Sequence, residues 1–181
     1  MTEHAFARQI RPARPRLRTI LGATVLAAGL SCAPVVLPAG SAFLSTSAQA
    51  ADPMQITGTT VYDSTNSLGD TATLKSKISA LSKKHNVDLH VVVIDKFENP
   101  STSSSWTKAL ATKNNWGSAD VVLVIATESR QAYFLAGSTK TLSSDQQTKV
   151  YQNYIKQKLQ NSDYSGAALA AVEGIEAQKG G

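Results

Sequence analysis

Two uninterrupted apolar runs constrain the fold of this chain more than any other feature of its sequence. They are residues 91–94 (VVVI), within the longer segment 87–94, and residues 121–126 (VVLVIA). Successive side chains of a β-strand point to opposite faces of the sheet, so a strand that is apolar at every position is covered on both faces. The sequence therefore predicts two central strands that lie between two layers of helices.

The segments around these runs carry further patterns. Leu74, Ile78 and Leu81 recur at i, i+4 and i+7 and predict a helix over residues 71–84. A second helix is predicted over residues 105–113, between the two runs, where it acts as a crossover that makes the central strands parallel. Residues 59–62 are predicted as a short edge strand, after a lead-in at 51–58. Residues 131–136 are predicted as a strand antiparallel to 121–126.

Two more helices are predicted toward the C-terminus. Ser143 and Gln146 have the spacing of a capping box for a helix that continues to about residue 159. Asp163 or Ser165 is suited to cap the last helix, which we expect to end before Lys179. Together these elements predict an α/β fold with a mixed, mostly parallel sheet.

The first fifty residues have the pattern of an export signal. Five arginines precede an apolar run at 20–30, and small residues follow, ending in Ser47-Ala48-Gln49-Ala50. This arrangement is typical of a Sec-type signal peptide cleaved after Ala50. The alternative is an uncleaved membrane anchor, which the prolines at 34 and 38 disfavour because they interrupt the run. We therefore expect residues 1–50 to be a signal peptide and residues 51–181 to form a single exported domain.

Charge and cysteine content exclude two classes of partner. The net charge of the chain is +5, but residues 51–181 hold thirteen Lys and Arg against twelve Asp and Glu, a net of +1. A near-neutral domain lacks the basic surface that binds a phosphate backbone, so we expect no nucleic-acid partner. The single cysteine, Cys32, lies in the predicted signal peptide. We therefore expect neither a disulfide-linked oligomer nor a thiolate metal site.

Three carboxylates are the leading candidates for a binding site. The familiar nucleophile, phosphate-loop, zinc and dinucleotide motifs are missing from the sequence, so no organic cofactor is expected. Asp63, Asp95 and Asp120 are predicted at the ends of extended segments, where ligands of open α/β sheets gather. Such loops suit calcium or magnesium. We expect a weak cation site in a loop cluster that contains Asp63 and Asp120, with Asp95 close by. The alternative is that Asp63 and Asp120 only cap turns.

Two less favoured candidates complete the set. His85, Asp88 and His90 surround the start of a predicted strand, on which Asp88 and His90 share one face, and could chelate a metal. The competing interpretation is a helix-capping histidine, a strand-entry aspartate and a half-buried histidine. Arg130 is the only arginine after residue 50 and hence the only candidate for bidentate contact with a phosphate.

The order and spacing of several short motifs resemble the TPM domain family. These motifs are VYD at 61–63, HNVDLHVVVI at 85–94, NWGSADVVLVIA at 115–126, ESR at 128–130 and DYSGAA at 163–168. The resemblance covers residues 58–178, which is nearly all of the expected exported domain.

The resemblance implies a three-layer α/β/α sandwich on the extracytoplasmic side of a membrane, tethered to it where the natural chain continues beyond residue 181. Acid phosphatase activity and calcium binding are associated with some members, and others are accessory domains of membrane-protein complexes. Asp63, Asp120 and Arg130 fall on motif positions of the family. Ala119 departs from the pattern, because many relatives carry an acidic or amide residue there, so one oxygen ligand is missing.

Two functions remain open at this point. The first is an extracytoplasmic accessory or binding domain that holds calcium loosely and assists a membrane-protein complex or another partner in the cell envelope. The alternative is a metal-assisted acid phosphatase, with carboxylates on the metal and Arg130 or a lysine on the phosphate. The sequence shows no constellation of nucleophile and general base, which favours the accessory role.

Overall fold

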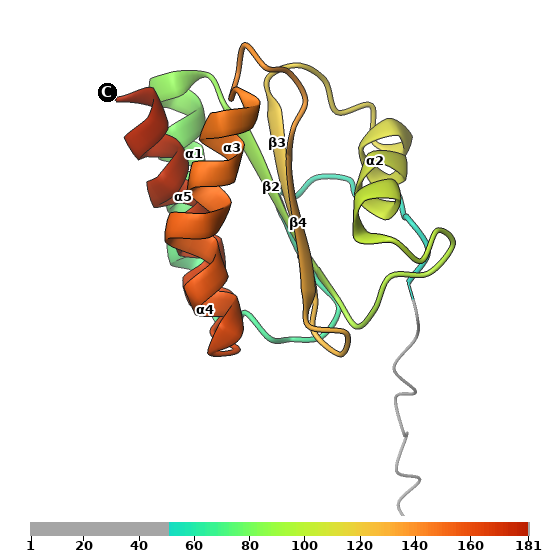
Figure 1. Ribbon diagram of the computed structural model, residues 1–181. Coiled ribbons are helices and arrows are strands. Elements are labelled where there is room, and N and C mark those ends of the chain that lie inside the picture. The colour runs from blue at the N-terminus through green and yellow to red at the C-terminus, as the bar shows by residue number, and fades with distance from the viewer. Residues whose placement is uncertain (1–50, 181) are drawn as a thin grey trace, which may run out of the picture. The chain divides into compact units, whose positions relative to one another are not determined.

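The computed structural model describes residues 51–180, and these residues form one sheet with helices on both of its faces (Figure 1). The strands are β1 (Val61–Asp63), β2 (Asp88–Ile94), β3 (Asp120–Ala126) and β4 (Gln131–Ala136). The helical elements are α1 (Ala72–His85), α2 (Ser103–Lys113), α3 (Ser144–Val150), the π-helical turn η1 (Tyr151–Ile155), α4 (Lys156–Gln160) and α5 (Tyr164–Lys179). The predicted signal peptide at 1–50 lies outside the described residues.

The sheet is mixed and mostly parallel, as the sequence predicts. Its strand order is β1-β2-β3-β4; β1 pairs with β2 and β2 with β3 in parallel, and β4 is antiparallel to β3. The register places Tyr62, Val92, Val124 and Tyr133 side by side across the sheet. The predicted crossover helix α2 therefore joins two parallel neighbours.

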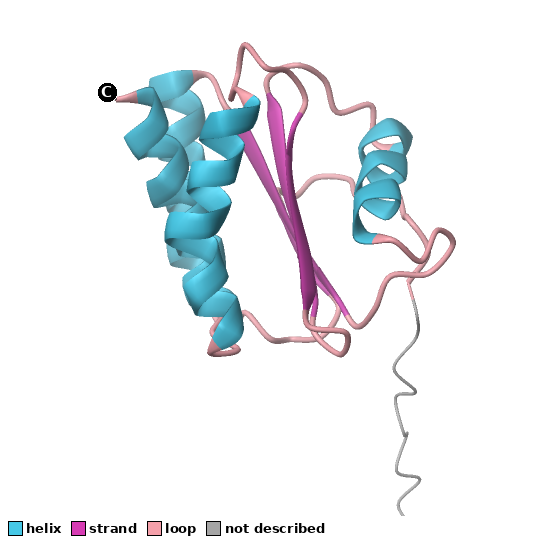
Figure 2. Cartoon of the chain, in the orientation of Figure 1, coloured by secondary structure: helices cyan, strands magenta, loops and turns pink. Residues whose placement is uncertain are grey.

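Three layers are visible when the sheet is viewed on edge (Figure 2). Helices α1, α3, α4 and α5 cover one face, and α2 lies against the other (Figure 1). Val91 and Val93 belong to the core cluster on the four-helix side, whereas Val92 and Ile94 belong to the cluster that surrounds Trp106 of α2. This alternation is the reason that the uninterrupted apolar run at 91–94 is needed here, and it confirms the α/β/α sandwich.

Two of the predicted helix caps are present. The Ser143 hydroxyl accepts a hydrogen bond from the Gln146 amide, and the Gln146 side chain accepts one from the Ser143 amide. At the start of α5, the Asp163 carboxylate accepts a hydrogen bond from the Gly166 amide at 2.8 Å. Both caps satisfy amides that a helix leaves without internal partners.

The helix predicted over 144–159 differs from the expectation in its middle. Its turn at Tyr151–Ile155 is π-helical, and it separates α3 from α4. Val150 and Ile155, five residues apart, are both fully buried. Five residues do not return to the same face of a regular α-helix, so the wider turn is what allows both side chains to reach the core.

The lead-in at 51–58 is more closely tied to the domain than its sequence suggests. The Trp106 indole donates to the Ala51 carbonyl at 2.7 Å, and the Asn114 amide group donates to the Met54 carbonyl at 2.9 Å. Met54 and Ile56 pack against the core cluster on the α2 side. This segment therefore covers, together with α2, the face of the sheet that α2 packs against.

The C-terminal end of the fold also differs from its prediction. Helix α5 continues through Lys179, which we expected to lie beyond it. No helix within residues 51–180 has both the length and the apolar character needed to cross a lipid bilayer.

Candidate functional site

Asp63 and Asp95 lie at the carboxyl edge of the sheet, meaning the edge where the parallel strands β1, β2 and β3 end. Asp63 is the last residue of β1, and Asp95 directly follows β2. The Ser64 amide donates to the Val93 carbonyl at 3.1 Å, which ties the loop after β1 to the end of β2. The Glu128 amide donates to the Asp95 carbonyl at 2.8 Å, which ties the loop after β2 to the turn after β3. The structure therefore brings two of the three predicted carboxylates to one edge.

The Asp63 carboxylate is fixed by hydrogen bonds from its own loop. One oxygen accepts from the Thr65 amide at 2.9 Å and from the Thr65 hydroxyl at 2.8 Å, and the other accepts from the Leu68 amide at 2.8 Å. These three bonds organise the turn between β1 and α1, which is the turn-capping role considered as the alternative. A carboxylate has about four lone-pair positions, so one remains for a ligand.

Asp120 lies at the opposite edge of the sheet, which we call the amino edge. It is the first residue of β3 and pairs in register with Asp88, whereas Asp63 pairs with Val93. Five strand residues at about 3.3 Å each separate the two levels by roughly 17 Å. The structure thus does not bring Asp63 and Asp120 into the shared loop cluster that we expected. The cause is that Asp120 begins its strand, whereas Asp63 ends one.

Asp120 instead joins a compact polar cluster with His90 and Trp116. One carboxylate oxygen lies 2.7 Å from His90 Nε2, and the other accepts a hydrogen bond from the Gly117 amide at 2.6 Å. The His90 ring stacks on the Trp116 ring, with centroids 4.1 Å apart and planes 15° from parallel. His90 Nδ1 is buried and has no hydrogen-bond partner among the described residues. These contacts hold the loop before β3 against β2.

The triad of His85, Asp88 and His90 does not assemble. The Asp88 carboxylate accepts a hydrogen bond from the Ser82 hydroxyl at 2.6 Å, and the partner of His90 is Asp120. Across residues 51–180, no three His, Cys, Asp or Glu side chains gather in a way that could hold a metal ion. A cation bound here would therefore draw most of its oxygen ligands from backbone carbonyls, neutral side-chain oxygens or water.

Arg130 lies at the carboxyl edge, in the turn between β3 and β4, with a left-handed φ of 51°. It lines a hollow of about 370 Å³ together with Tyr151, Lys156, Leu159 and Gln160. Sequence reasoning identified Arg130 but missed Lys156, because only the folded arrangement of α4 beside the turn brings the second cation to the same hollow. Neither cation forms an ion pair with any of residues 51–180.

The same edge carries one more charged pair. Lys96 lies 3.0 Å from the Glu98 carboxylate. The hydrogen bond to Glu98, together with the negative charge of that carboxylate, raises the pKa of Lys96 above its usual value. Both side chains are well exposed, so this pair contributes little to the stability of the loop.

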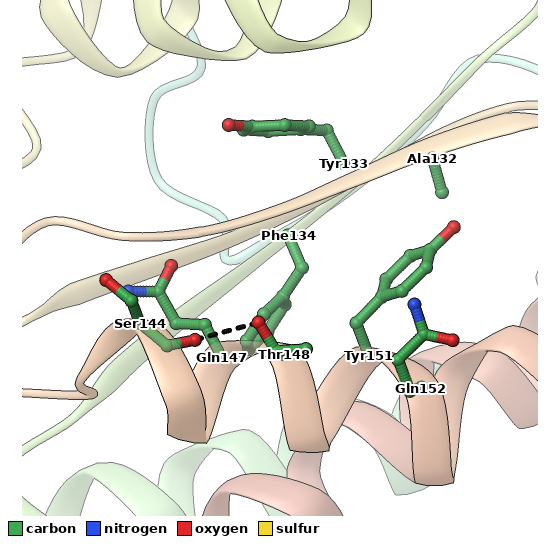
Figure 3. Close-up of a pocket in the computed structure, with 8 residues that line it drawn as sticks. All are labelled: Ala132, Tyr133, Phe134, Ser144, Gln147, Thr148, Tyr151 and Gln152. Atoms are coloured by element: carbon green, nitrogen blue, oxygen red, sulfur yellow. Dashed lines mark hydrogen bonds between the residues drawn. The ribbon is translucent and has the colours of Figure 1, made fainter.

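A larger groove of about 440 Å³ runs between β4 and the α3–η1 segment. Its lining residues are Ala132, Tyr133, Phe134, Ser144, Gln147, Thr148, Tyr151 and Gln152 (Figure 3). Ala132 and Phe134 project toward the helix, and Tyr133 projects to the other face of the sheet (Figure 3). No lining residue is charged. No sequence pattern predicts this groove, because it arises from how the helix lies along the strand.

The family model described as the TPM domain matches residues 61–178. The UPF0603 proteins Rv2345 and MT2410, from two strains of Mycobacterium tuberculosis, are each 30% identical to this chain over 165 residues. The aligned region covers 88% of this chain and 23% of each relative, so the chain spans about a quarter of the length of these relatives.

Two solved structures have the same architecture, and their low identity limits the likeness to the fold. The N-terminal domain of the cg2496 protein from Corynebacterium glutamicum gives a TM-score of 0.58 at 20% identity, over 71% of this chain and 85% of that one. The N-terminal domain of a protein from P. gingivalis gives 0.56 at 16% identity, over 67% and 84%. The match of the family model over residues 61–178 establishes that the chain belongs to the TPM domain family.

Proposed function

We propose that this chain is an extracytoplasmic binding domain with an accessory role in a complex of the cell envelope, and that it holds calcium or magnesium loosely at the carboxyl edge. The observation that carries the cation site is the Asp63 carboxylate, which three donors hold in place next to the loop of Asp95. A fixed carboxylate with one open lone-pair position reduces the ordering cost of cation binding.

The accessory role is supported by how such domains are used in the relatives. The matched region makes up 23% of the UPF0603 proteins of M. tuberculosis, and both solved neighbours are N-terminal domains of longer proteins. A domain that recurs as one part of longer proteins is suited to bind a partner or an ion for the protein that contains it. The signal pattern of residues 1–50 supports a location outside the cytoplasm.

A metal-assisted phosphatase is the second candidate, and the hollow beside Arg130 is the observation in its favour. Arg130 and Lys156 line this hollow, and two cations suit the oxygens of a phosphate monoester. Tyr151 belongs to the same lining. In this alternative, a metal ion at Asp63 and Asp95 would supply the activated water at the same edge.

NMR titration of the ¹⁵N-labelled protein secreted from a bacterial host tests both candidates. Added Ca²⁺ is expected to shift the amides of residues 63–68 and 95–98, with a dissociation constant of about 10⁻⁴–10⁻³ M, the range of weak extracellular calcium sites. Asp95→Ala should remove this response. Asp88→Ala, a carboxylate at the amino edge, is the matched control and should keep it.

The outcomes separate the candidates. Calcium shifts that survive Asp95→Ala, or that appear at the amino edge, contradict the proposed cation site. Steady hydrolysis of p-nitrophenyl phosphate that requires the metal ion and is lost in Arg130→Ala would establish the phosphatase in place of the binding domain. Shifts without turnover support the binding role.

A further inference from the structure

Strand β4 leaves one side of its backbone without a neighbouring strand. It is the last strand of the sheet, and the Gly137 amide that follows it donates to the Asp120 carbonyl at 2.8 Å. Hydrogen-bonded pairs alternate along an antiparallel ladder. With the observed register, Tyr133 and Leu135 therefore direct their backbone groups toward β3, and Ala132 and Phe134 direct theirs outward.

A side chain already occupies one end of this free edge. The Ala136 amide, which also points outward, donates to the Gln147 side-chain oxygen at 3.1 Å, and the Gln147 amide group donates to the Leu142 carbonyl at 2.9 Å. The Gln147 side-chain oxygen thus takes the place that one backbone carbonyl of an additional strand would occupy. The outward N–H groups of Ala132 and Phe134 have no such partner within residues 51–180.

The edge also lacks the features that usually prevent strand addition. Natural edge strands carry charges, prolines or bulges, or are covered by another element. The β4 sequence QAYFLA has no charged residue, proline or glycine. The groove described above opens directly beside it, and the Phe134 and Tyr151 rings supply apolar surface there (Figure 3).

Charge is concentrated at one end of the groove. Tyr151 lines both the groove and the neighbouring hollow, so the two adjoin each other. The hollow brings Arg130 and Lys156 to the end at which β4 begins, whereas the lining of the groove itself is uncharged. An occupant that complements this surface is neutral along its length and acidic at one end.

We propose that β4 takes up an extended segment of a partner protein as a fifth strand, antiparallel to β4, with an Asp or Glu side chain at its carboxyl end beside Arg130 and Lys156. The antiparallel direction follows the more stable ladder and places the carboxyl end of the segment where β4 begins. Main-chain hydrogen bonds at Ala132 and Phe134 give affinity in this mode, and the groove and the cations give selectivity. The inference rests on the accessory role proposed above but not on its cation site.

The probe for the test is the blocked peptide acetyl-Val-Thr-Val-Thr-Val-Glu-amide, titrated into the ¹⁵N-labelled secreted protein. We expect amide shifts confined to β4, α3 and η1. Two N-methylated versions of the peptide, with methyl groups on alternate residues, test strand addition directly because only one of the two alternating sets of amides faces β4. One version should lose binding and the other should keep it.

Variants of the protein test the two ends of the surface. Replacing the terminal Glu of the peptide by Lys should weaken binding about five-fold, the effect of one exposed ion pair. Lys156→Glu should abolish or invert this preference. Ala132→Pro removes an outward N–H and should abolish binding, and its ¹H–¹⁵N spectrum reports whether it remains folded. If it does not fold, the methylated peptides decide the question on the unaltered protein.

Three results would overturn the inference: no shifts at millimolar peptide, equal binding of both methylated peptides, or a dimer in sedimentation that Ala132→Pro dissociates. The last result would identify a second copy of the chain as the occupant. A lost peptide response with an intact calcium response refutes strand addition and leaves the cation site standing. The reverse result refutes the cation site alone.

Discussion

The Asp120 side chain and backbone hold together three segments that are distant along the chain. Its carboxylate contacts His90 of β2 and the Gly117 amide, and its carbonyl accepts a hydrogen bond from the Gly137 amide after β4. Its side chain is only 20% exposed. A carboxylate in this setting acts as a structural anchor, which the sequence could not reveal because the contacts come from β2 and from the residue after β4.

Replacing this anchor is expected to destabilise the domain. Asp120→Ala leaves His90 Nε2 and the Gly117 amide without their partner, which costs about 1–3 kcal/mol of the free energy of unfolding. Chemical denaturation measures the loss, and Glu173→Ala, at an exposed position of α5, is the control. Equal stability of the two variants would show that Asp120 holds nothing in place.

Two glycines that face each other near Asp120 are expected to respond very differently to the same substitution. A Cβ atom at Gly137 would lie 1.9 Å from the Gly117 carbonyl oxygen, whereas a Cβ atom at Gly117 would meet only the Asp120 carboxylate, at 3.9 Å. Gly137→Ala must therefore displace backbone, at a cost of about 1–3 kcal/mol or more. Gly117→Ala should cost much less. Thermal melting of the two variants checks this difference. A Gly117→Ala variant with a lower melting temperature than Gly137→Ala would contradict it.

Helix α2 and the segment that precedes β1 stabilise each other. The Asn114 side chain alone makes three contacts: its oxygen accepts from the Ile56 amide at 2.6 Å, and its amide group donates to the Met54 and Leu110 carbonyls. Helix α2 is the only helix on its face of the sheet within the described residues. Asn114 therefore links the first described residues to the core cluster around Trp106.

Removal of this link is expected to release the segment without unfolding the domain. In Asn114→Ala the Ile56 amide loses its acceptor and should exchange with solvent at least about ten-fold faster, because local opening then costs roughly 1.4 kcal/mol less. Amides of β3 should be unaffected. Hydrogen exchange followed by NMR measures the rates at Ile56 and in β3 separately. Faster exchange at every amide of the domain would indicate global destabilisation instead.

The elements that sequence reasoning recovered are those with a local cause. The Leu74–Ile78–Leu81 spacing, the Ser143–Gln146 capping box and the two apolar runs each depend on neighbours a few residues away, and all were confirmed. The wider turn at η1 and the packing of residues 51–56 depend on α5 and α2, and the sequence did not show them. Asp120 did not join Asp63 and Asp95 for a different reason. It begins a strand that is parallel to the strands ending at Asp63 and just before Asp95, so it lies at the opposite edge of the sheet.

At the scale of the whole molecule, the distribution of charge predicts how the chain is processed. The basic residues gathered in the first eighteen positions and the Ala48-Gln49-Ala50 motif predict cleavage after Ala50. Intact-mass analysis of the protein secreted by a Gram-positive host should show Ala51 as the first residue. A mature protein that keeps residues 1–50 would contradict the prediction.

The π-helical turn at Tyr151–Ile155 means that this helix contains one residue more than its packing requires. In a regular α-helix a deletion rotates everything beyond it by about 100°, and for that reason insertions and deletions normally survive only in loops. Here the π-helical turn accommodates the extra residue, so the helix segments before and after it both face the core, and Val150 and Ile155 are both buried. Deletion of Gln152 would bring these two side chains to the four-residue spacing of an ordinary helix face. This helix therefore offers the chain a place to change its length inside an element of secondary structure, beside Arg130, while keeping its core.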